Sequence, residues 1–218
     1  MRSLLLATLV LAFGAPAAHA AVQVDMHVAP EETRYGQVTE VTGTALLDGA
    51  PFAGQPLQLE ARRYPFEGDF APIEETVTAA DGTYRFELEL DRNTDLRVTT
   101  GGAVSPRERA YVFPAVTLSF RARNSRVIRL TQRYRVPRGV RLEKPTIFYV
   151  GPRGAKRAPR AATGEVERVR PGRYRSTAVV RLPAAWKGRF RYASCFRYTG
   201  GSGMGNPRAT CPRRFRFR

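Results

Sequence analysis

The chain has 218 residues, of which 43% are apolar, and it carries a formal net charge of +17 at pH 7. This apolar fraction can build a core, which excludes a wholly disordered chain. Only two histidines occur in the sequence, so catalysis or zinc binding by several imidazole groups is excluded as well. We therefore expect a folded protein that does not depend on histidine chemistry.

Residues 1–20 have the pattern of an export signal. Arg2 forms a short basic region, an apolar run extends from Leu4 to Phe13, and residues 18–20 fit a small-x-small cleavage site. The run is much shorter than the roughly 20 apolar residues that span a bilayer. We expect no transmembrane segment in the mature chain, and the alternative is a retained N-terminal anchor. The sequence thus predicts a protein that is secreted, either extracellular or associated with the cell wall.

Apolar and polar residues alternate at period two along most of the remaining chain. The clearest example follows the turn signal Asp81-Gly82, where Tyr84, Phe86 and Leu88 alternate with charged residues. Similar alternation is found in segments 22–28, 57–62, 116–123, 128–136, 174–182 and 190–198. We find no amphipathic helical stripe with caps. The predicted fold class is therefore all-β.

Charge divides the mature chain into two unlike halves. Residues 21–114 contain 16 acidic and 8 basic residues, whereas residues 115–218 contain 3 acidic and 27 basic residues. A weak internal repeat agrees with this division, since segments 56–59 and 82–85 match 145–148 and 172–175. The offset of about 90 residues is the size of a seven-strand sandwich. We predict an acidic immunoglobulin-like domain at 21–114 and a basic, arginine-rich β-sandwich domain at 115–218.

Several segments of the first half carry turn and core motifs in a characteristic order. They are Gly43-Thr44-Ala45, the strand at 56–59, the hairpin at 80–86 and the strand at 93–98. This order resembles secreted bacterial immunoglobulin-like or transthyretin-like domains, which occur in tandem in high-G+C Gram-positive bacteria. The resemblance covers residues 37–98 well and residues 115–218 loosely. It implies two tandem β-sandwiches that act in the envelope, in adhesion or in structure, without a shared catalytic centre.

The two cysteines, Cys195 and Cys211, lie close together in the sequence. An oxidising compartment favours their pairing, and closing this loop would stabilise the fold by about 3 kcal/mol. Their spacing is not that of a redox pair, and a metal site would need further ligands. We predict a structural disulfide. The glycine-dense stretch 199–207 inside the loop lacks the ending of a phosphate-binding loop, and we predict a flexible tip there.

Groups that could catalyse a reaction are few. His27 is the single histidine after the predicted signal, and no G-x-S-x-G motif occurs. Glu87, Glu89 and Asp91 share one strand face, but such a row is also the solvated face of an antiparallel sheet. Residues 91–95 imitate a calcium loop, with Leu96 where glycine is required. We expect neither enzymatic activity nor a cofactor nor a bound metal, and an unrecognised enzyme is the remote alternative.

Arginine is the strongest remaining signal, with 24 Arg against 3 Lys in the second half. A basic face interleaved with aromatic residues can bind phosphates by charge and planar groups by stacking. The alternative is a general compositional preference for arginine, which does not explain why acidic residues are scarce in this half alone. If the strands are as predicted, five arginines share outward faces: Arg121, Arg123, Arg129, Arg133 and Arg135.

These features predict an exported, non-enzymatic binding or structural module of the cell envelope or extracellular space. Its basic domain would contact an anionic envelope polymer, an acidic protein surface or anionic lipid headgroups. We expect no specific nucleic-acid partner. The alternative function is internal, because an acidic and a basic domain could also dock on each other or drive self-association without an external polyanion.

Overall fold

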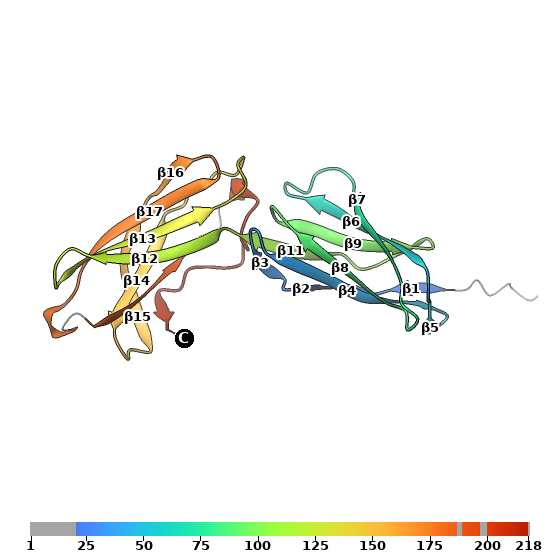
Figure 1. The fold of residues 1–218 in the computed structure, drawn as a ribbon, viewed down its shortest axis with the longest axis horizontal. Coiled ribbons are helices and arrows are strands. Elements are labelled where there is room, and N and C mark those ends of the chain that lie inside the picture. Colours follow the sequence, from blue (N-terminus) through green and yellow to red (C-terminus); the bar gives the residue numbers. More distant parts are fainter. Residues whose placement is uncertain (1–20, 187–188, 197–199, 218) are drawn as a thin grey trace, which may run out of the picture.

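The computed structural model describes residues 21–186, 189–196 and 200–217. Figure 1 shows two β-sandwiches placed end to end. The all-β prediction is confirmed, since the helices of the described residues are two 3-10 turns, η1 (Ala184–Trp186) and η2 (Gly200–Ser202). None of the described helices has the length and apolar character needed to cross a membrane. The predicted export signal, residues 1–20, lies outside the described residues.

The first sandwich packs a five-stranded sheet on a six-stranded one. In the five-stranded sheet the long strand β4 is central and pairs with all four others; its members are β1 (Val22–Val24), β2 (His27–Ala29), β4 (Val38–Leu47), β5 (Ala50–Pro51) and β8 (Thr83–Glu89). The other sheet has the order β3-β11-β9-β6-β7, with β10 beside β9. Its strands are β3 (Glu32–Arg34), β6 (Pro56–Arg63), β7 (Ala71–Val77), β9 (Thr94–Thr100), β10 (Ala103–Val104) and β11 (Glu108–Phe113).

The second sandwich has two four-stranded sheets. One has the order β12-β13-β17-β16 and the other β18-β14-β15-β19. The strands of the former are β12 (Ala115–Ala122), β13 (Val127–Arg135), β16 (Val166–Arg170) and β17 (Arg173–Arg181). Those of the latter are β14 (Thr146–Pro152), β15 (Arg157–Gly164), β18 (Phe190–Cys195) and β19 (Arg214–Arg216).

The period-two pattern determines which side chains enter each core. In β8, Tyr84, Phe86 and Leu88 are buried, and the residues between them are exposed. In β17, alternate residues from Tyr174 to Val180 are buried in the same way. Because successive side chains of a strand point to opposite faces, each strand has one face in the core and one in solvent.

Both sandwiches use the strand order of immunoglobulin-like domains. In the first, β2-β4-β8 faces β9-β6-β7, and in the second, β12-β13-β17 faces β18-β14-β15. These orders correspond to strands A-B-E opposite F-C-C′. The internal repeat falls on equivalent strands, because segments 56–59 and 145–148 lie at β6 and β14, and segments 82–85 and 172–175 lie at β8 and β17.

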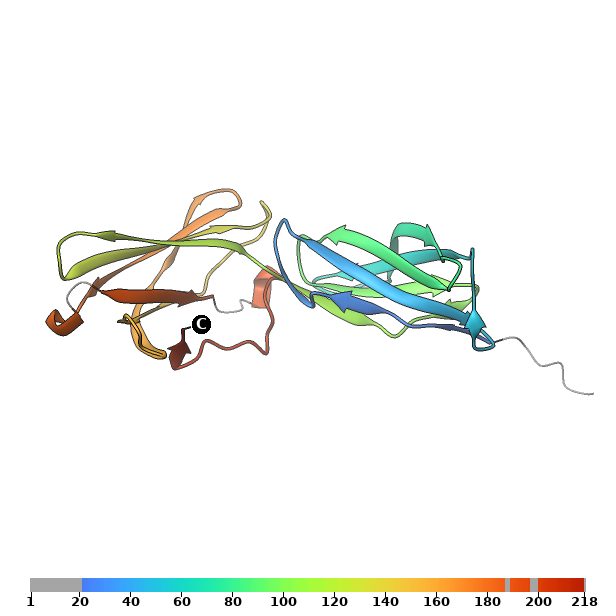
Figure 2. The same cartoon turned by 60° about the horizontal axis from the view of Figure 1, so that its bottom comes forward.

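The last strand of each sandwich takes a different position. In the first sandwich β11 pairs antiparallel with β9, which is the place of strand G. In the second, β19 pairs with β15 at the opposite edge, so β18 is the outermost strand of its sheet. In Figure 2 the chain leaves the second sandwich after β18, reaches the junction near η2 and returns to the second sandwich at β19.

The segment that makes this detour fastens the two sandwiches to each other. Residues 203–205, which we call the latch, bond to the first sandwich: the Asn93 amide donates to the Gly203 carbonyl (2.7 Å), and the Gly205 amide donates to the Val112 carbonyl (2.7 Å). The Asn93 side chain also donates to the Gly205 carbonyl (2.8 Å) and accepts from the Val112 amide (2.9 Å). Met204 is fully buried between them.

The prediction of a flexible tip is therefore wrong for residues 203–206, which are hydrogen-bonded to the first sandwich, and residue 199 lies outside the described residues. The density of glycine is typical of a flexible loop, whereas Gly203 allows the chain to approach the Tyr64 ring closely. Gly203 has a φ of 64°, and a Cβ at this position would lie 2.6 Å from the ring of Tyr64. Glycine at position 203 thus lets the backbone lie against the first sandwich.

An apolar cluster continues through the junction. Tyr134, Val136, Tyr174 and Met204 of the second half belong to the same buried cluster as the core of the first sandwich. The two sandwiches are thus held by shared apolar burial and by backbone hydrogen bonds. Among the described residues, none of the ion pairs joins one half of the chain to the other.

Candidate functional site

The five predicted arginines all lie on the surface of the second sandwich. Arg129, Arg133 and Arg135 alternate with the buried Ile128, Leu130 and Tyr134 on β13 and are exposed. Arg121 is exposed near the end of β12, and Arg123 is exposed in the turn that follows this strand. The structure therefore places four of the five on one sheet, with Arg123 just beyond its end.

Strand pairing adds arginines that the sequence analysis did not select. Arg133 lies directly opposite Arg175, and Arg135 lies directly opposite Arg173, in the register of β13 and β17. On the far side of β17, Arg170 of β16 is opposite Arg173. We call Arg133, Arg135, Arg173 and Arg175 the arginine grid. The outer surface of this sheet, the arginine face, combines the grid with Arg121, Arg129, Arg170 and Arg181.

The geometry of the grid brings like charges close together. Directly opposed residues in an antiparallel pair have Cβ atoms about 5 Å apart, and like charges there are destabilising. Residues two apart on one strand are separated by roughly 7 Å. A further opposed pair lies farther along the same sheet, where Arg121 faces Arg129. Folding therefore concentrates positive charge on this face.

Few carboxylates neutralise this charge. Within the described residues, Glu167 is the only carboxylate in an ion pair with the grid, through Arg175 at 3.2 Å. Both side chains of that pair are at least half exposed, so the pair contributes little to stability. Arg133, Arg135 and Arg173 have no carboxylate within ion-pair distance among the described residues.

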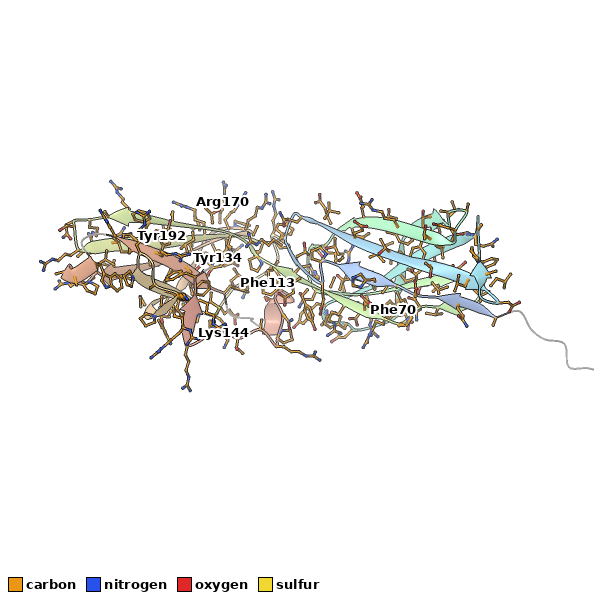
Figure 3. All side chains as sticks on the ribbon, turned by 90° about the horizontal axis from the view of Figure 1, so that it is seen from below. Phe70, Phe113, Tyr134, Lys144, Arg170 and Tyr192 are labelled. Atoms are coloured by element: carbon orange, nitrogen blue, oxygen red, sulfur yellow. A yellow bond between two sulfur atoms is a disulfide. The ribbon has the colours of Figure 1, made fainter. Side chains whose placement is uncertain are left out.

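Two grooves follow the face toward the junction. The first, about 700 Å³, lies over the grid between β12, β13 and the β16–β17 hairpin. The second, about 900 Å³, lies where the sandwiches meet and is lined by Tyr35, Gly36 and Glu89 of the first half and by Arg135, Arg138, Arg170 and Arg173 of the second. Arg135, Arg170 and Arg173 line both grooves, so the two grooves lie next to each other. Figure 3 shows nitrogen-tipped side chains crowded around Arg170 at this end.

The first half shapes the position of Arg135. Its guanidinium lies over the ring of Tyr35, 5.8 Å from the centroid, a cation–π geometry. Gly36 has a φ of 81°, and a Cβ there would lie 2.8 Å from Arg135 Nη2. Glycine thus serves the turn and also leaves room for the arginine. The guanidinium has an aromatic support that leaves its N–H groups available to an anion.

Arginines of the first half are used in a different way. The Asp95 carboxylate is fully buried and receives hydrogen bonds from Arg109 (2.6 and 3.0 Å), Arg62 (3.2 Å) and Arg107 (3.4 Å). Burial alone would raise the pKa of Asp95, but the hydrogen bonds and charge of Arg109, together with Arg62 and Arg107, outweigh it and hold the pKa below its usual value. The guanidinium of Arg109 also lies 3.8 Å from the centroid of the Phe66 ring.

The surroundings of Asp95 differ from those of a calcium ligand. Asp95, which the calcium-like segment 91–95 offers as a ligand, is instead surrounded by arginines, and a cation there would be repelled. No group of three or more His, Cys, Asp or Glu that could hold a metal ion occurs in the part of the chain that the structure describes. His27 is exposed and lies 3.9 Å from Glu108.

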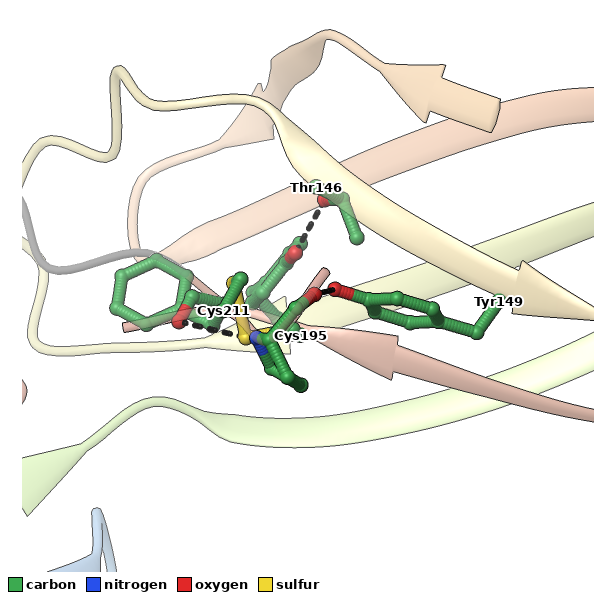
Figure 4. Close-up of a disulfide and its surroundings, with 7 residues drawn as sticks. Thr146, Tyr149, Cys195 and Cys211 are labelled. Carbon is green, nitrogen blue, oxygen red and sulfur yellow. Dashed lines mark hydrogen bonds between the residues drawn. A yellow bond between two sulfur atoms is a disulfide. The ribbon is translucent and has the colours of Figure 1, made fainter. Parts of the chain in front are cut away.

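The predicted disulfide is present. Cys195 at the end of β18 is bonded to Cys211, with an S–S distance of 2.08 Å and a Cα–Cα distance of 5.7 Å. Figure 4 shows it beside Tyr149, whose hydroxyl donates to the Pro212 carbonyl. The bond ties the segment that leads to β19 onto the outer face of β14, where Tyr149, Phe215 and Phe217 pack. Such a bond indicates an extracytoplasmic compartment.

No known family model matches the sequence, and no curated protein matches it. Among solved structures, the chain is similar to trypsin-activated alpha-2-macroglobulin from Escherichia coli, with 15% identity and a TM-score of 0.32, over 87% of this chain and 15% of that one. The native conformation of the E. coli protein gives 14% identity, a TM-score of 0.34, and coverage of 84% and 12%. A Salmonella alpha-2-macroglobulin mutant gives 19%, 0.33, and coverage of 84% and 13%.

The chain therefore spans 12–15% of the length of these solved proteins. The likeness is distant. Membership of the immunoglobulin-like or transthyretin-like proteins of high-G+C Gram-positive bacteria stays a prediction from the motifs at 37–98.

Proposed function

We propose that the chain is an exported, non-enzymatic module whose arginine face binds an anionic polymer at the cell envelope or outside the cell. The observation that carries the proposal is the grid, because four arginines are brought into register on neighbouring strands and one of them has a carboxylate partner. A fold that needed only a solvated surface could alternate charges there, as β8 does with Arg85 and Glu87. The disulfide supports export.

The chemistry of the face favours phosphate groups. Each guanidinium presents five N–H donors in a planar fork, and a phosphate has enough oxygens to serve several forks together. The grooves that share Arg135, Arg170 and Arg173 lie next to each other along the sheet, which suits a linear polymer better than a compact ligand. Of the three partner classes expected from the sequence, a phosphate-bearing envelope polymer fits best, ahead of an acidic protein surface or lipid headgroups.

The alternative, in which the two charged halves dock on each other, receives less support. The junction is built mainly from apolar residues and backbone hydrogen bonds, and beside the latch the Asn206 side chain donates to Glu32 at 2.8 Å. The arginine face reaches the junction at Arg135, whose guanidinium lies over Tyr35 of the first half, and its arginines stay exposed. The positive charge of the second half is therefore available to a partner outside the molecule.

The test compares binding of poly(glycerol phosphate) by the full chain and by a triple variant, Arg133→Gln, Arg135→Gln and Arg173→Gln. Counterion release makes the logarithm of affinity fall linearly with the logarithm of salt concentration, and each engaged charge adds roughly one to the slope. The triple variant should therefore show a slope that is smaller by roughly 2–3. Binding is measured by titration at several salt concentrations.

A matched control removes the same charge from the other sheet. Arg157→Gln, Arg213→Gln and Arg214→Gln alter exposed arginines at β15 and β19. This control should keep nearly the parental slope. Equal slopes for both triple variants would show that net charge alone attracts the polymer, and the proposed site would be rejected.

A further inference from the structure

Among the described residues, the second sandwich has no strand at the edge where the first sandwich has β11. In the first, β11 covers the edge of β9, whereas the equivalent strand β18 (Phe190–Cys195) ends its sheet among the described strands. The chain that could have continued as strand G is diverted into the latch and then pairs with β15. The exposed edge of β18 is therefore a place where another strand can be added.

Aromatic side chains are left partly uncovered at this edge. Phe120 of β12 is 47% exposed, and its ring centroid lies 5.1 Å from Phe190 and 5.2 Å from Tyr192. These three rings, with the exposed Arg153 and Arg189, line a groove of about 680 Å³. Tyr192 is labelled in Figure 3. An added strand would cover the rings and complete the sandwich, which gives the edge both an apolar and a basic element for recognition.

The first half offers a strand of the opposite character. Strand β7 (Ala71–Val77) is the outermost strand of its sheet and is exposed along nearly all its length. Ile73 is 38% exposed and Val77 is 62% exposed. Between them lie Glu74 and Glu75, and the strand has no basic residue. Apolar residues and carboxylates on β7 thus match rings and arginines at β18.

We propose that β7 of a second copy of this chain adds beside β18, so that copies associate head to tail. Like charges disfavour contact of two β18 edges or of two β7 edges, which leaves the mixed pair favoured. Because the two surfaces differ, each copy keeps a free edge, and the association produces chains of copies. This inference is independent of the proposed polymer binding, which uses the outer face of the other sheet.

Sedimentation velocity at low salt, over a wide range of protein concentration, tests the contact. Two charge-reversal variants are compared with the parent: Glu74→Arg with Glu75→Arg, and Arg153→Glu with Arg189→Glu. Each should self-associate on the order of tenfold more weakly than the parent, because opposite charges become like charges. A 1:1 mixture of the two should again form chains, in which the two variants alternate, since the native pair of edges and the charge-swapped pair are both complementary.

The control variant, Arg129→Glu with Arg181→Glu, changes the net charge as the β18 variant does but alters exposed residues of the arginine face. It should associate like the parent. A parent that stays monomeric throughout overturns the proposal, even if the edge captures some other acidic protein. Association that the Glu74 and Glu75 reversals leave unchanged overturns it as well. Neither result bears on poly(glycerol phosphate) binding, so the two proposals fail separately.

Discussion

The two sandwiches share a strand order but place arginine in opposite settings. In the first, Arg62, Arg107 and Arg109 surround the buried Asp95. In the second, Arg133 and Arg135 face other arginines across the sheet. In the first setting the charges are satisfied within the molecule, and in the second they are not. The comparison indicates that charge in the first half serves the fold, whereas charge in the second half is available to a ligand.

Removing the central carboxylate should have the largest effect. Asp95→Asn removes the buried carboxylate that three partly exposed arginines share. Because each hydrogen bond to a charged group contributes about 1.5–3 kcal/mol and several are weakened together, we expect a loss of about 3–5 kcal/mol. Urea unfolding of the full chain measures the loss. Asp91→Asn, which alters the more exposed pair with Arg92, is the control and should cost less than about 1 kcal/mol.

The same carboxylate gives the first half a pH dependence. Since the folded-state pKa of Asp95 is lowered, its contribution is complete above the unfolded-state value and is lost as pH falls through the folded-state value. The stability difference between the parent and Asp95→Asn should therefore shrink in acid. A difference that stays constant from neutral to strongly acidic pH would contradict this role.

Loss of the disulfide should be next in size. Cys195→Ser releases the segment that covers Tyr149 and should destabilise the second sandwich by about 2–4 kcal/mol. Because the chain from β18 to β19 also contains the latch, hydrogen exchange should rise at Met204 as well as at Phe215. Two thiols that titrate in the native exported protein would show that the bond is absent.

Cutting the latch should have an intermediate effect. Asn93→Ala removes the side chain that bonds both Gly205 and Val112 and leaves buried groups without partners, at about 1–3 kcal/mol. X-ray scattering should show a wider range of orientations of the two sandwiches. Asn124→Ala, in the exposed turn before β13, is the control and should leave scattering unchanged.

The strand pattern was predictable, and the partners of the strands were not. The alternation of apolar and polar residues correctly predicted that Arg129, Arg133 and Arg135 point outward, because this alternation depends only on neighbours in the sequence. The opposition of Arg133 and Arg175 depends on β13 pairing with β17, with three strands between them in the sequence, and no local pattern encodes that register. Alternation around Tyr174 did place Arg175 on an outward face, and this was the one available signal.

The latch was missed for a different reason. Glycine density is typical of mobile loops and also of backbone that must approach a neighbour closely, and the sequence does not separate the two. Only the structure shows that Met204, the apolar residue within the stretch, is buried and that the stretch therefore docks on the first sandwich. The disulfide was predictable from Cys195 and Cys211 alone, since an exported chain with two cysteines favours one pairing.

The smallest expected effect is also the most direct test of the central claim that the arginine grid is an unsatisfied binding surface. It is the urea midpoint of the parent and of the Arg133, Arg135 and Arg173 triple Gln variant, each with and without poly(glycerol phosphate). Without polymer the variant should be as stable or more stable by up to about 1 kcal/mol, because opposed like charges are removed. With polymer the parent should gain stability and the variant little, since a ligand stabilises only the state it binds. A variant that loses stability without polymer, or gains as much as the parent with it, would contradict the account.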